Sequence, residues 1–185
     1  AGASPQLASH HLARLIEAGV VSVRPSGRHR YHRLAAEEVA RAVESLAVAG
    51  GALAARGPRR VRAPEEVRFA RSCYDHLAGA LGVAVGERIL TRGLIGADGA
   101  ITTTGSELLE GLGAVPAKGR ARPCLDWTER RDHWAGGFAN ALYAGMIERR
   151  ILARRTGSRA LSVTPLGAQW LRERLELEFT QLRAA

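Results

Sequence analysis

The sequence predicts a mostly α chain with short β-hairpins, an α+β fold, and three observations indicate it. Apolar residues recur at helical spacing over residues 5–19 and 37–54. Between these segments, two short runs rich in Val and Arg flank the turn residues Pro25-Ser26-Gly27. Glycine and proline then cluster between residues 50 and 64. We therefore expect one domain over 1–54, a linker over 55–64 and a second domain over 65–185.

The first helix is expected to begin at Pro5. Ser4 is a good N-cap and proline suits the first helical position, where no N–H is needed. Gly19 is expected to end the helix. One face carries the apolar and small residues, namely Ala8, Leu12, Leu15, Ile16 and Gly19. The opposite face is polar and free to contact a partner.

The polar face suits duplex DNA. Gln6 can pair with adenine, Ser9 and His10 can reach base edges, and Arg14 can reach a phosphate or a guanine. Strands over Val20–Val23 and Arg28–Leu34 then form a basic hairpin, in which Arg28, His29 and Arg30 suit backbone or minor-groove contact. The alternative is a solvated basic helix followed by an ordinary hairpin.

The order of these parts resembles the recognition helix and wing of the ArsR/SmtB family of bacterial winged-helix repressors. The residues that carry the resemblance are Ser4-Pro5-Gln6, Ser9-His10-His11-Leu12, Leu15, Ala18-Gly19-Val20-Val21, Gly27-Arg28, Tyr31 and Leu34. It implies a homodimeric repressor with a winged helix-turn-helix, released from its operator by a metal or metalloid ion, thiol oxidation or a small molecule. The implied DNA-binding residues are Ser4, Gln6, Leu7, Ser9, His10, His11, Arg14, Arg28, His29 and Arg30.

The sequence also departs from the family pattern. It has no initiator methionine, and Ala1-Gly2-Ala3 resembles the turn inside a helix-turn-helix, so the helices before it are expected to be missing. The helix expected over 37–54 carries no His or Asp, which excludes the family metal site built from such residues there. Its apolar stripe of Val39, Val43 and Leu46 predicts a dimer interface.

Composition favours a polyanionic partner. The 185 residues carry a formal charge of +9 and a pI near 11.0. No apolar run reaches the length of a membrane span and no signal peptide is visible, so we expect a cytoplasmic, nucleoid-associated protein without membrane contact. The sequence contains no phosphate-binding glycine loop, nucleophile elbow or His-Glu metal motif, and we expect no enzyme.

The second predicted domain contains a possible internal repeat. Residues 100–109 align with 162–171: in both, a Thr follows a short strand and a Gly comes three residues later. Upstream, residues 89–95 resemble 146–152. The repeat predicts two helix-plus-hairpin units, each ending in a Thr-capped helix, and therefore a second helical or winged domain. The alternative is coincidence between two ordinary strand-to-helix junctions.

Two cysteines raise the question of sensing. A helix from Glu65 onward would place Phe69, Cys73, Leu77 and Leu81 on one face, with His76 beside Cys73. A second helix is expected from a capping box of Asp126 and Glu129, with His133 on its second turn and Trp134, Phe138, Leu142 and Met146 at apolar spacing.

If these segments pack together, four side chains become candidate ligands for zinc, another thiophilic ion or a metalloid: Cys73, His76, Cys124 and His133. A thiol redox switch is a second possibility. We expect neither of these. We expect both cysteines to be enclosed core residues that lie too far apart to form a disulfide, with no cofactor bound. An inducer pocket would then lie among the aromatic residues near Arg130 and Arg131, which are Trp127, Trp134, Phe138 and Tyr143.

The expected function is a sequence-specific DNA-binding regulator, a homodimeric repressor released by an inducer. The alternative is a ligand-binding or thiol- or metal-sensing protein that uses its winged helices for protein contacts.

Overall fold

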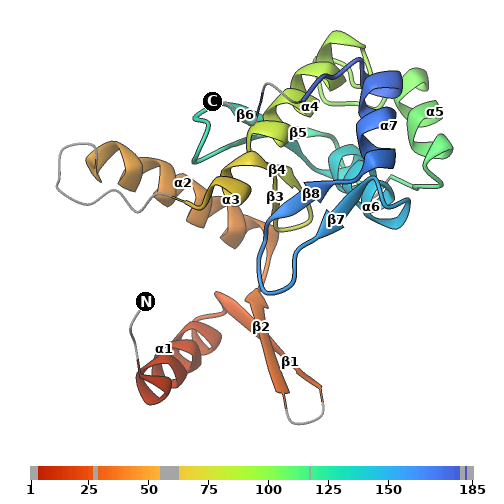
Figure 1. Ribbon diagram of the computed structural model, residues 1–185. Coiled ribbons are helices and arrows are strands. Elements are labelled where there is room, and N and C mark those ends of the chain that lie inside the picture. The colour runs from red at the N-terminus through yellow and green to blue at the C-terminus, as the bar shows by residue number, and fades with distance from the viewer. Residues whose placement is uncertain (1–3, 27–28, 55–62, 117, 180–181, 183–185) are drawn as a thin grey trace. The chain divides into compact units, whose positions relative to one another are not determined.

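The computed structural model describes residues 4–26, 29–54, 63–116, 118–179 and 182 (Figure 1). Contacts divide the chain into two compact units, Ala1–Val43 and Glu44–Ala185. Unit 1 contains helix α1 (Pro5–Glu17), strands β1 (Val21–Ser26) and β2 (His29–Leu34), and the first part of helix α2 (Glu37–Ala54). Helix α2 continues into unit 2. The chain is therefore α+β and of winged-helix type, as the sequence predicts.

Helix α1 has the two ends that the sequence predicts. The Ser4 hydroxyl oxygen accepts a hydrogen bond from the Leu7 N–H, and Pro5 occupies the first turn. At the other end, the Gly19 N–H donates to Ile16 and the Val20 N–H donates to Leu15. These two bonds form a Schellman motif, in which Gly19 adopts a φ of +70° that glycine tolerates.

Strands β1 and β2 pair antiparallel, with Val21 opposite Leu34 and Ser26 opposite His29. The prediction that Pro25 and Ser26 form the turn is therefore wrong, because both lie in β1. Both strands of a two-stranded ribbon are edge strands, and edge strands tolerate proline. The connecting residues 27–28 lie outside the described residues.

Unit 2 consists of short helices and hairpins in a regular order. Its elements are α3 (Glu65–Phe69), β3 (Arg71–Cys73), β4 (His76–Ala78), α4 (Ala80–Thr91), α5 (Thr103–Gly111), β5 (Arg122–Leu125), β6 (Asp132–Ala135), α6 (Gly137–Glu148), β7 (Leu152–Arg154), β8 (Leu161–Val163) and α7 (Pro165–Leu175). Each odd-numbered strand pairs with the next in an antiparallel two-stranded sheet. No described helix is long and apolar enough to cross a bilayer.

The order of elements repeats within unit 2. The first copy runs β3–β4, α4, an isolated bridge between Ile95 and Ile101, and α5. The second runs β5–β6, α6, β7–β8 and α7. The repeat therefore begins earlier than the sequence comparison suggested, because each copy starts with a hairpin ahead of its first helix.

Each copy ends in a helix capped by threonine, as predicted. The Thr102 hydroxyl accepts from the Gly105 N–H and donates to the Gly93 carbonyl. The Thr164 hydroxyl accepts from the Gly167 N–H and donates to the Arg150 carbonyl. Each threonine thus caps its own helix and ties it to the end of the preceding helix.

The starts of α4 and α6 are also built alike. Gly79 and Gly136 precede these helices with φ of +83° and +88°. A Cβ at Gly79 would lie 2.7 Å from the Arg68 carbonyl oxygen, and one at Gly136 would lie 2.3 Å from that of Arg120. Both positions require glycine because of the backbone angle and the close approach of another chain segment.

The two copies share one core. Helix α4 packs against β6 of the second copy, and α6 packs against β4 of the first. Large side chains from both copies are fully buried, including Leu81, Ile89, Phe138 and Met146. Because each helix covers the hairpin of the other copy, the two halves are interlocked rather than independent domains.

Candidate functional site

The polar face of α1 is open to solvent. Gln6, Ser9, His10, His11 and Arg14 are all exposed, and Leu7 is 47% exposed. Ser4 is committed to capping the helix. No residue of α1 is buried, although Ala8, Leu12 and Ile16 on the apolar face are half-buried. This helix therefore presents a continuous polar surface from its first turn to its last.

The hairpin beside α1 is basic. Arg30, His32 and Arg33 are exposed, and the Arg33 Nε donates to the Ser22 hydroxyl at 3.3 Å. Of the other candidates, Arg28 lies outside the described residues, as does the side chain of His29. The described part of the hairpin thus offers cationic side chains without acidic neighbours on its strands.

Helix α2 carries its predicted apolar stripe with little cover in this chain. Val39 is half-buried, Val43 is 46% exposed and Leu46 is 71% exposed. Its first turn is acidic, with Glu37 and Glu38 favourably placed for the helix dipole. An exposed apolar stripe on a well-formed helix is a feature that a partner can bury.

The segments that carry the cysteines differ from the prediction. The expected helix through Cys73 and Leu77 is wrong, since α3 ends at Phe69 and residues 71–78 form the β3–β4 hairpin. The expected helix from Asp126 is also wrong, because β5–β6 pair across residues 122–135 and α6 begins only at Gly137. The Asp126 carboxylate does accept from the Thr128 and Glu129 N–H groups, but it caps a turn.

The hairpins place cysteine and histidine opposite each other twice. Cys73 pairs with His76 across β3–β4, and Cys124 pairs with His133 across β5–β6. The surrounding sequence repeats as well. Arg71-x-Cys73 and His76-x-Ala78-Gly79 in the first copy match Arg122-x-Cys124 and His133-x-Ala135-Gly136 in the second. This pattern is the sequence signal that locates both hairpins, and reasoning from helical spacing missed it.

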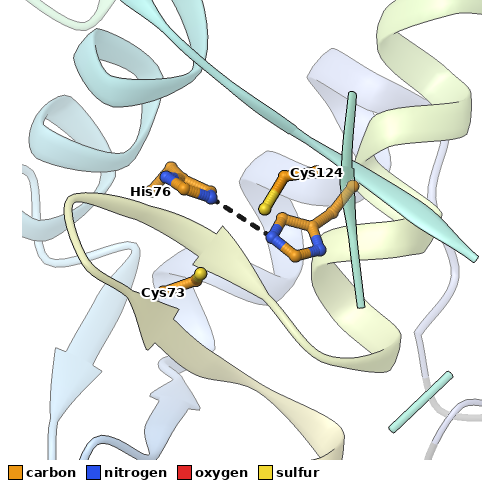
Figure 2. A group of neighbouring side chains, drawn as sticks. Cys73, His76 and Cys124 are labelled. Atoms are coloured by element: carbon orange, nitrogen blue, oxygen red, sulfur yellow. Dashed lines mark hydrogen bonds between the residues drawn. The ribbon is translucent and has the colours of Figure 1, made fainter. Parts of the chain in front are cut away.

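The two hairpins bring these four side chains into one buried cluster (Figure 2). One donor atom from each residue lies within 4.8 Å of every other. The exposed fractions are 1% for Cys73, 1% for His76, 5% for Cys124 and 0% for His133. The expectation that the cysteines are enclosed is therefore confirmed, but the expectation that they lie too far apart is wrong, because the hairpins of the two copies meet.

The imidazoles of the cluster face each other. The Nε2 atoms of His76 and His133 are 3.2 Å apart, as the dashed line in Figure 2 marks. The other ring nitrogens point to carboxylates. The His76 Nδ1 is 3.3 Å from the Asp75 Oδ1, and the His133 Nδ1 is 3.3 Å from the Asp126 Oδ2 in an ion-pair contact without ideal hydrogen-bond direction.

The cluster shifts the pKa values of its members. Burial opposes the charged imidazolium of His133, but the contacts with Asp126 and Cys124 outweigh burial and raise its pKa to about 9. The pKa of His76 is also raised, since Asp75 and Cys124 outweigh burial and the neighbouring His133. Hydrogen bonding with Cys73 and with both imidazoles, acting against burial, lowers the pKa of Cys124 to about 2. The site thus favours a thiolate beside cationic groups.

Asp126 links the two copies beneath the cluster. Its Oδ1 accepts from the Arg71 Nη2 at 2.9 Å, and its Oδ2 accepts from the Gly79 N–H at 2.7 Å. Both Arg71 and Asp126 are fully buried. Burial opposes ionisation, but His133, Arg71 and Thr128 hold the pKa of Asp126 well below its usual range. This carboxylate joins β5–β6 to β3 and to the start of α4.

Asp75 provides a matching link on the other side of the cluster. Its Oδ2 accepts from the Asn140 Nδ2 at 2.7 Å, while its Oδ1 faces His76. Asp75 belongs to the first copy and Asn140 lies on α6 of the second. Each carboxylate beside the cluster therefore touches both copies.

A hollow of ≈ 560 Å³ lies nearby in unit 2, against α6. It is lined by Tyr74, Asp75, Val115, Asn140, Ala141, Tyr143, Ala144, Ile147, Glu148 and Arg154. The Arg154 guanidinium lies over the Tyr143 ring at 5.8 Å from its centroid. Of the four aromatic residues expected to line a cleft, only Tyr143 lines this hollow, whereas Trp134 and Tyr143 together line a much smaller cavity of ≈ 10 Å³.

Comparison with known proteins identifies a relative that spans both units. The chain is 35% identical over 176 residues to a Bacillus subtilis (strain 168) protein described as the uncharacterized HTH-type transcriptional regulator YdfF. The match covers 90% of this chain and 78% of the relative. No family model matches the chain, and no solved structure matches it.

Proposed function

The chain belongs to the family of HTH-type transcriptional regulators, and we propose that it binds duplex DNA as a homodimeric repressor of the ArsR/SmtB kind. The observation that carries this proposal is the order of α1 and the β1–β2 hairpin, with the polar face of α1 fully exposed. A helix with no buried residue and a basic hairpin beside it is suited to the major groove and the adjacent backbone.

The side chains on α1 divide into base readers and backbone contacts. Gln6, Ser9 and His10 carry donors and acceptors of the kind that read base edges. Leu7, His11 and Arg14 are also exposed on α1, and we assign them to contacts with the groove wall and the phosphates. The first turn of α1 carries the positive end of the helix dipole, which favours a nearby phosphate.

The hairpin supplies the non-specific part of the affinity. Arg30 is an exposed cation on β2, and Arg28 and His29 precede it in the chain. Contacts of this kind neutralise phosphates and release counterions. The formal charge of +9 supports the same partner.

Dimer formation is proposed through α2. Val43 and Leu46 are exposed in the single chain, and they share a face of the helix with Val39. A second copy that buries this stripe produces a two-fold protein, which suits an operator made of two half-sites.

The inducer is proposed to occupy the hollow beside α6. Its volume of ≈ 560 Å³ lies within the range of small-molecule sites. Arg154, Asp75 and Glu148 give its walls charged groups of both signs, whereas Tyr143 and Ile147 give apolar surface. These features suit a small ligand that carries both polar and apolar parts.

The experiment is a DNA-binding measurement across a salt series. Fluorescence anisotropy with labelled duplexes, first of random sequence and then enriched for binding, gives the affinity at each salt concentration. A DNA-binding protein loses log affinity linearly with log salt, by about 0.9 per phosphate contact. An affinity that is absent, or that salt leaves unchanged, would favour the alternative in which the winged helix contacts another protein.

A further inference from the structure

The Cys/His cluster, defined as Cys73, His76, Cys124 and His133, has the donor set of a metal site. Thiolate and imidazole are the ligands that zinc and related ions take in closed structural sites, where four protein groups surround the ion. All four donor atoms lie within 4.8 Å of one another. Two nitrogens bound to a tetrahedral zinc ion stand about 3.3 Å apart. The observed separation between the two Nε2 atoms is 3.2 Å.

The orientation of the imidazoles is a second, independent observation. In each histidine the Nδ1 faces a carboxylate oxygen at 3.3 Å, from Asp75 or from Asp126. An Nδ1 that faces a carboxylate is suited to carry the ring proton, and Nε2 is then the nitrogen that can bind a metal ion. Carboxylates placed in this way orient the histidine ligands of metal sites.

In neutral imidazoles that carry their proton on Nδ1, the two Nε2 lone pairs would face each other at 3.2 Å, and a cation between them would remove their repulsion. A proton shared by the two nitrogens would also relieve this repulsion, but it would engage only the imidazoles and would not bind the two sulfurs. A disulfide would use the two sulfurs and leave the histidines unexplained. A metal ion uses all four groups at once.

We infer that the Cys/His cluster binds one Zn²⁺-class ion in a four-coordinate site that ties the two hairpins of unit 2 together. In the bound state both cysteines are thiolates and both histidines are neutral imidazoles, and every proton that the four groups still carry on their metal-binding atoms is released to solvent on binding. A divalent ion with two thiolates has no net charge, which suits a site whose ligands are at most 5% exposed.

The burial of the ligands assigns the ion a structural role. The four protein ligands fill a tetrahedral coordination shell, and none is open to solvent for exchange with a substrate. The ion joins residues that are 57 positions apart in the chain, His76 and His133. None of the four ligands lines the proposed inducer hollow, although Asp75 borders both sites, and the metal site does not depend on whether the chain binds DNA.

The first test is metal content. The chain is produced without a histidine tag in zinc-supplemented medium, purified without chelator, and analysed by mass spectrometry for metals and for intact mass. We expect about one zinc ion per chain, as a single four-ligand site requires. Replacement by Co²⁺ is expected to give the absorption bands of tetrahedral cobalt with thiolate charge transfer. Zinc-free protein with a mass 2 Da below the reduced chain would overturn the inference in favour of a disulfide.

Matched variants identify the ligands. His133→Ala and His133→Cys leave similar space in the core, but only His133→Cys restores a ligand. We expect His133→Ala to lose the ion and His133→Cys to retain it as a Cys₃His site. His32→Ala, which removes an exposed histidine of β2, is expected to keep full metal content. Equal metal content in His133→Ala and the parent would overturn the inference.

A measurement on the parent chain covers the case in which a variant does not fold. A strong chelator is expected to lower the melting temperature of the parent, and added Zn²⁺ is expected to restore it, because an ion that binds only the folded state stabilises it. A melting temperature that neither treatment changes would overturn the inference.

Discussion

Gln6 and Arg30 are both exposed side chains of unit 1, but their removal is expected to affect DNA binding differently. Gln6→Ala should cost about 1–3 kcal/mol at particular operator positions and relax the base preference there. Arg30→Ala should weaken binding to all sequences alike and flatten the salt dependence. Competition anisotropy with single-base operator variants separates the two effects. Gln169→Ala, an exposed change on α7, is the control, and parental behaviour in both test variants would exclude this surface as the DNA reader.

The buried pair of Arg71 and Asp126 provides a second prediction for single residues. Arg71→Met removes the guanidinium that pairs with a fully buried carboxylate, which should lower the free energy of unfolding by about 3–5 kcal/mol. Arg172→Met breaks an exposed ion pair with Glu178 and should change the free energy of unfolding little. Urea titration measures both. Similar losses in the two variants would show that burial does not set the strength of the inner pair.

Single residues also show where sequence reasoning reaches its limit. Ser4, Gly19, Thr102 and Thr164 act within a few positions of themselves, and their roles as caps could be predicted from local chemistry. Asp126 could not be assigned in this way. Its spacing to Glu129 matches a capping box, whereas the arginine that pairs with it, Arg71, is 55 positions away. A local pattern cannot reveal a partner that only the tertiary fold supplies.

At the scale of elements, the threonine caps of α5 and α7 are expected to stabilise unit 2 measurably. Thr102→Ala removes the acceptor for the Gly105 N–H and the bond to the Gly93 carbonyl, and should cost about 1 kcal/mol of unfolding free energy. Thr104→Ala changes an exposed threonine in the first turn of the same helix and should cost less. Urea unfolding of both variants is the measurement, and an equal cost would show that the cap contributes little.

The elements that sequence reasoning predicted wrongly share one physical cause. Phe69, Cys73, Leu77 and Leu81 recur every four residues, which is typical of a helix. In the structure this run includes two three-residue strands, and β4 is buried throughout. Strand β4 shows no alternation and β3 is only three residues long, so periodicity cannot distinguish these strands from a buried helix. The Tyr74-Asp75 turn and Gly79 were the local signs of a hairpin.

At the scale of the whole molecule, assembly is the property to test. Val43→Asp places a charge within the apolar stripe of α2 and should convert a dimer to a monomer with weakened operator binding, because an unpaired charge is costly in an apolar contact. Ser45→Asp adds the same charge to an exposed position off the stripe and should leave the dimer intact. Sedimentation velocity measures whether each variant is a monomer or a dimer. An unchanged dimer in Val43→Asp would exclude this stripe from the interface.

The division of the Cys/His cluster between two hairpins has a consequence for the order of folding. Each hairpin pairs residues that are close together in the sequence, and pairing of this kind takes about 1–10 μs. Docking of the two hairpins closes a loop of 57 residues, and the chain loses the entropy of that closure before the contacts between the hairpins form. During synthesis from the N-terminus, Cys73 and His76 leave the ribosome well before Cys124 and His133. Cys73 and His76 therefore remain without the other two members of the cluster until the second hairpin has been synthesised.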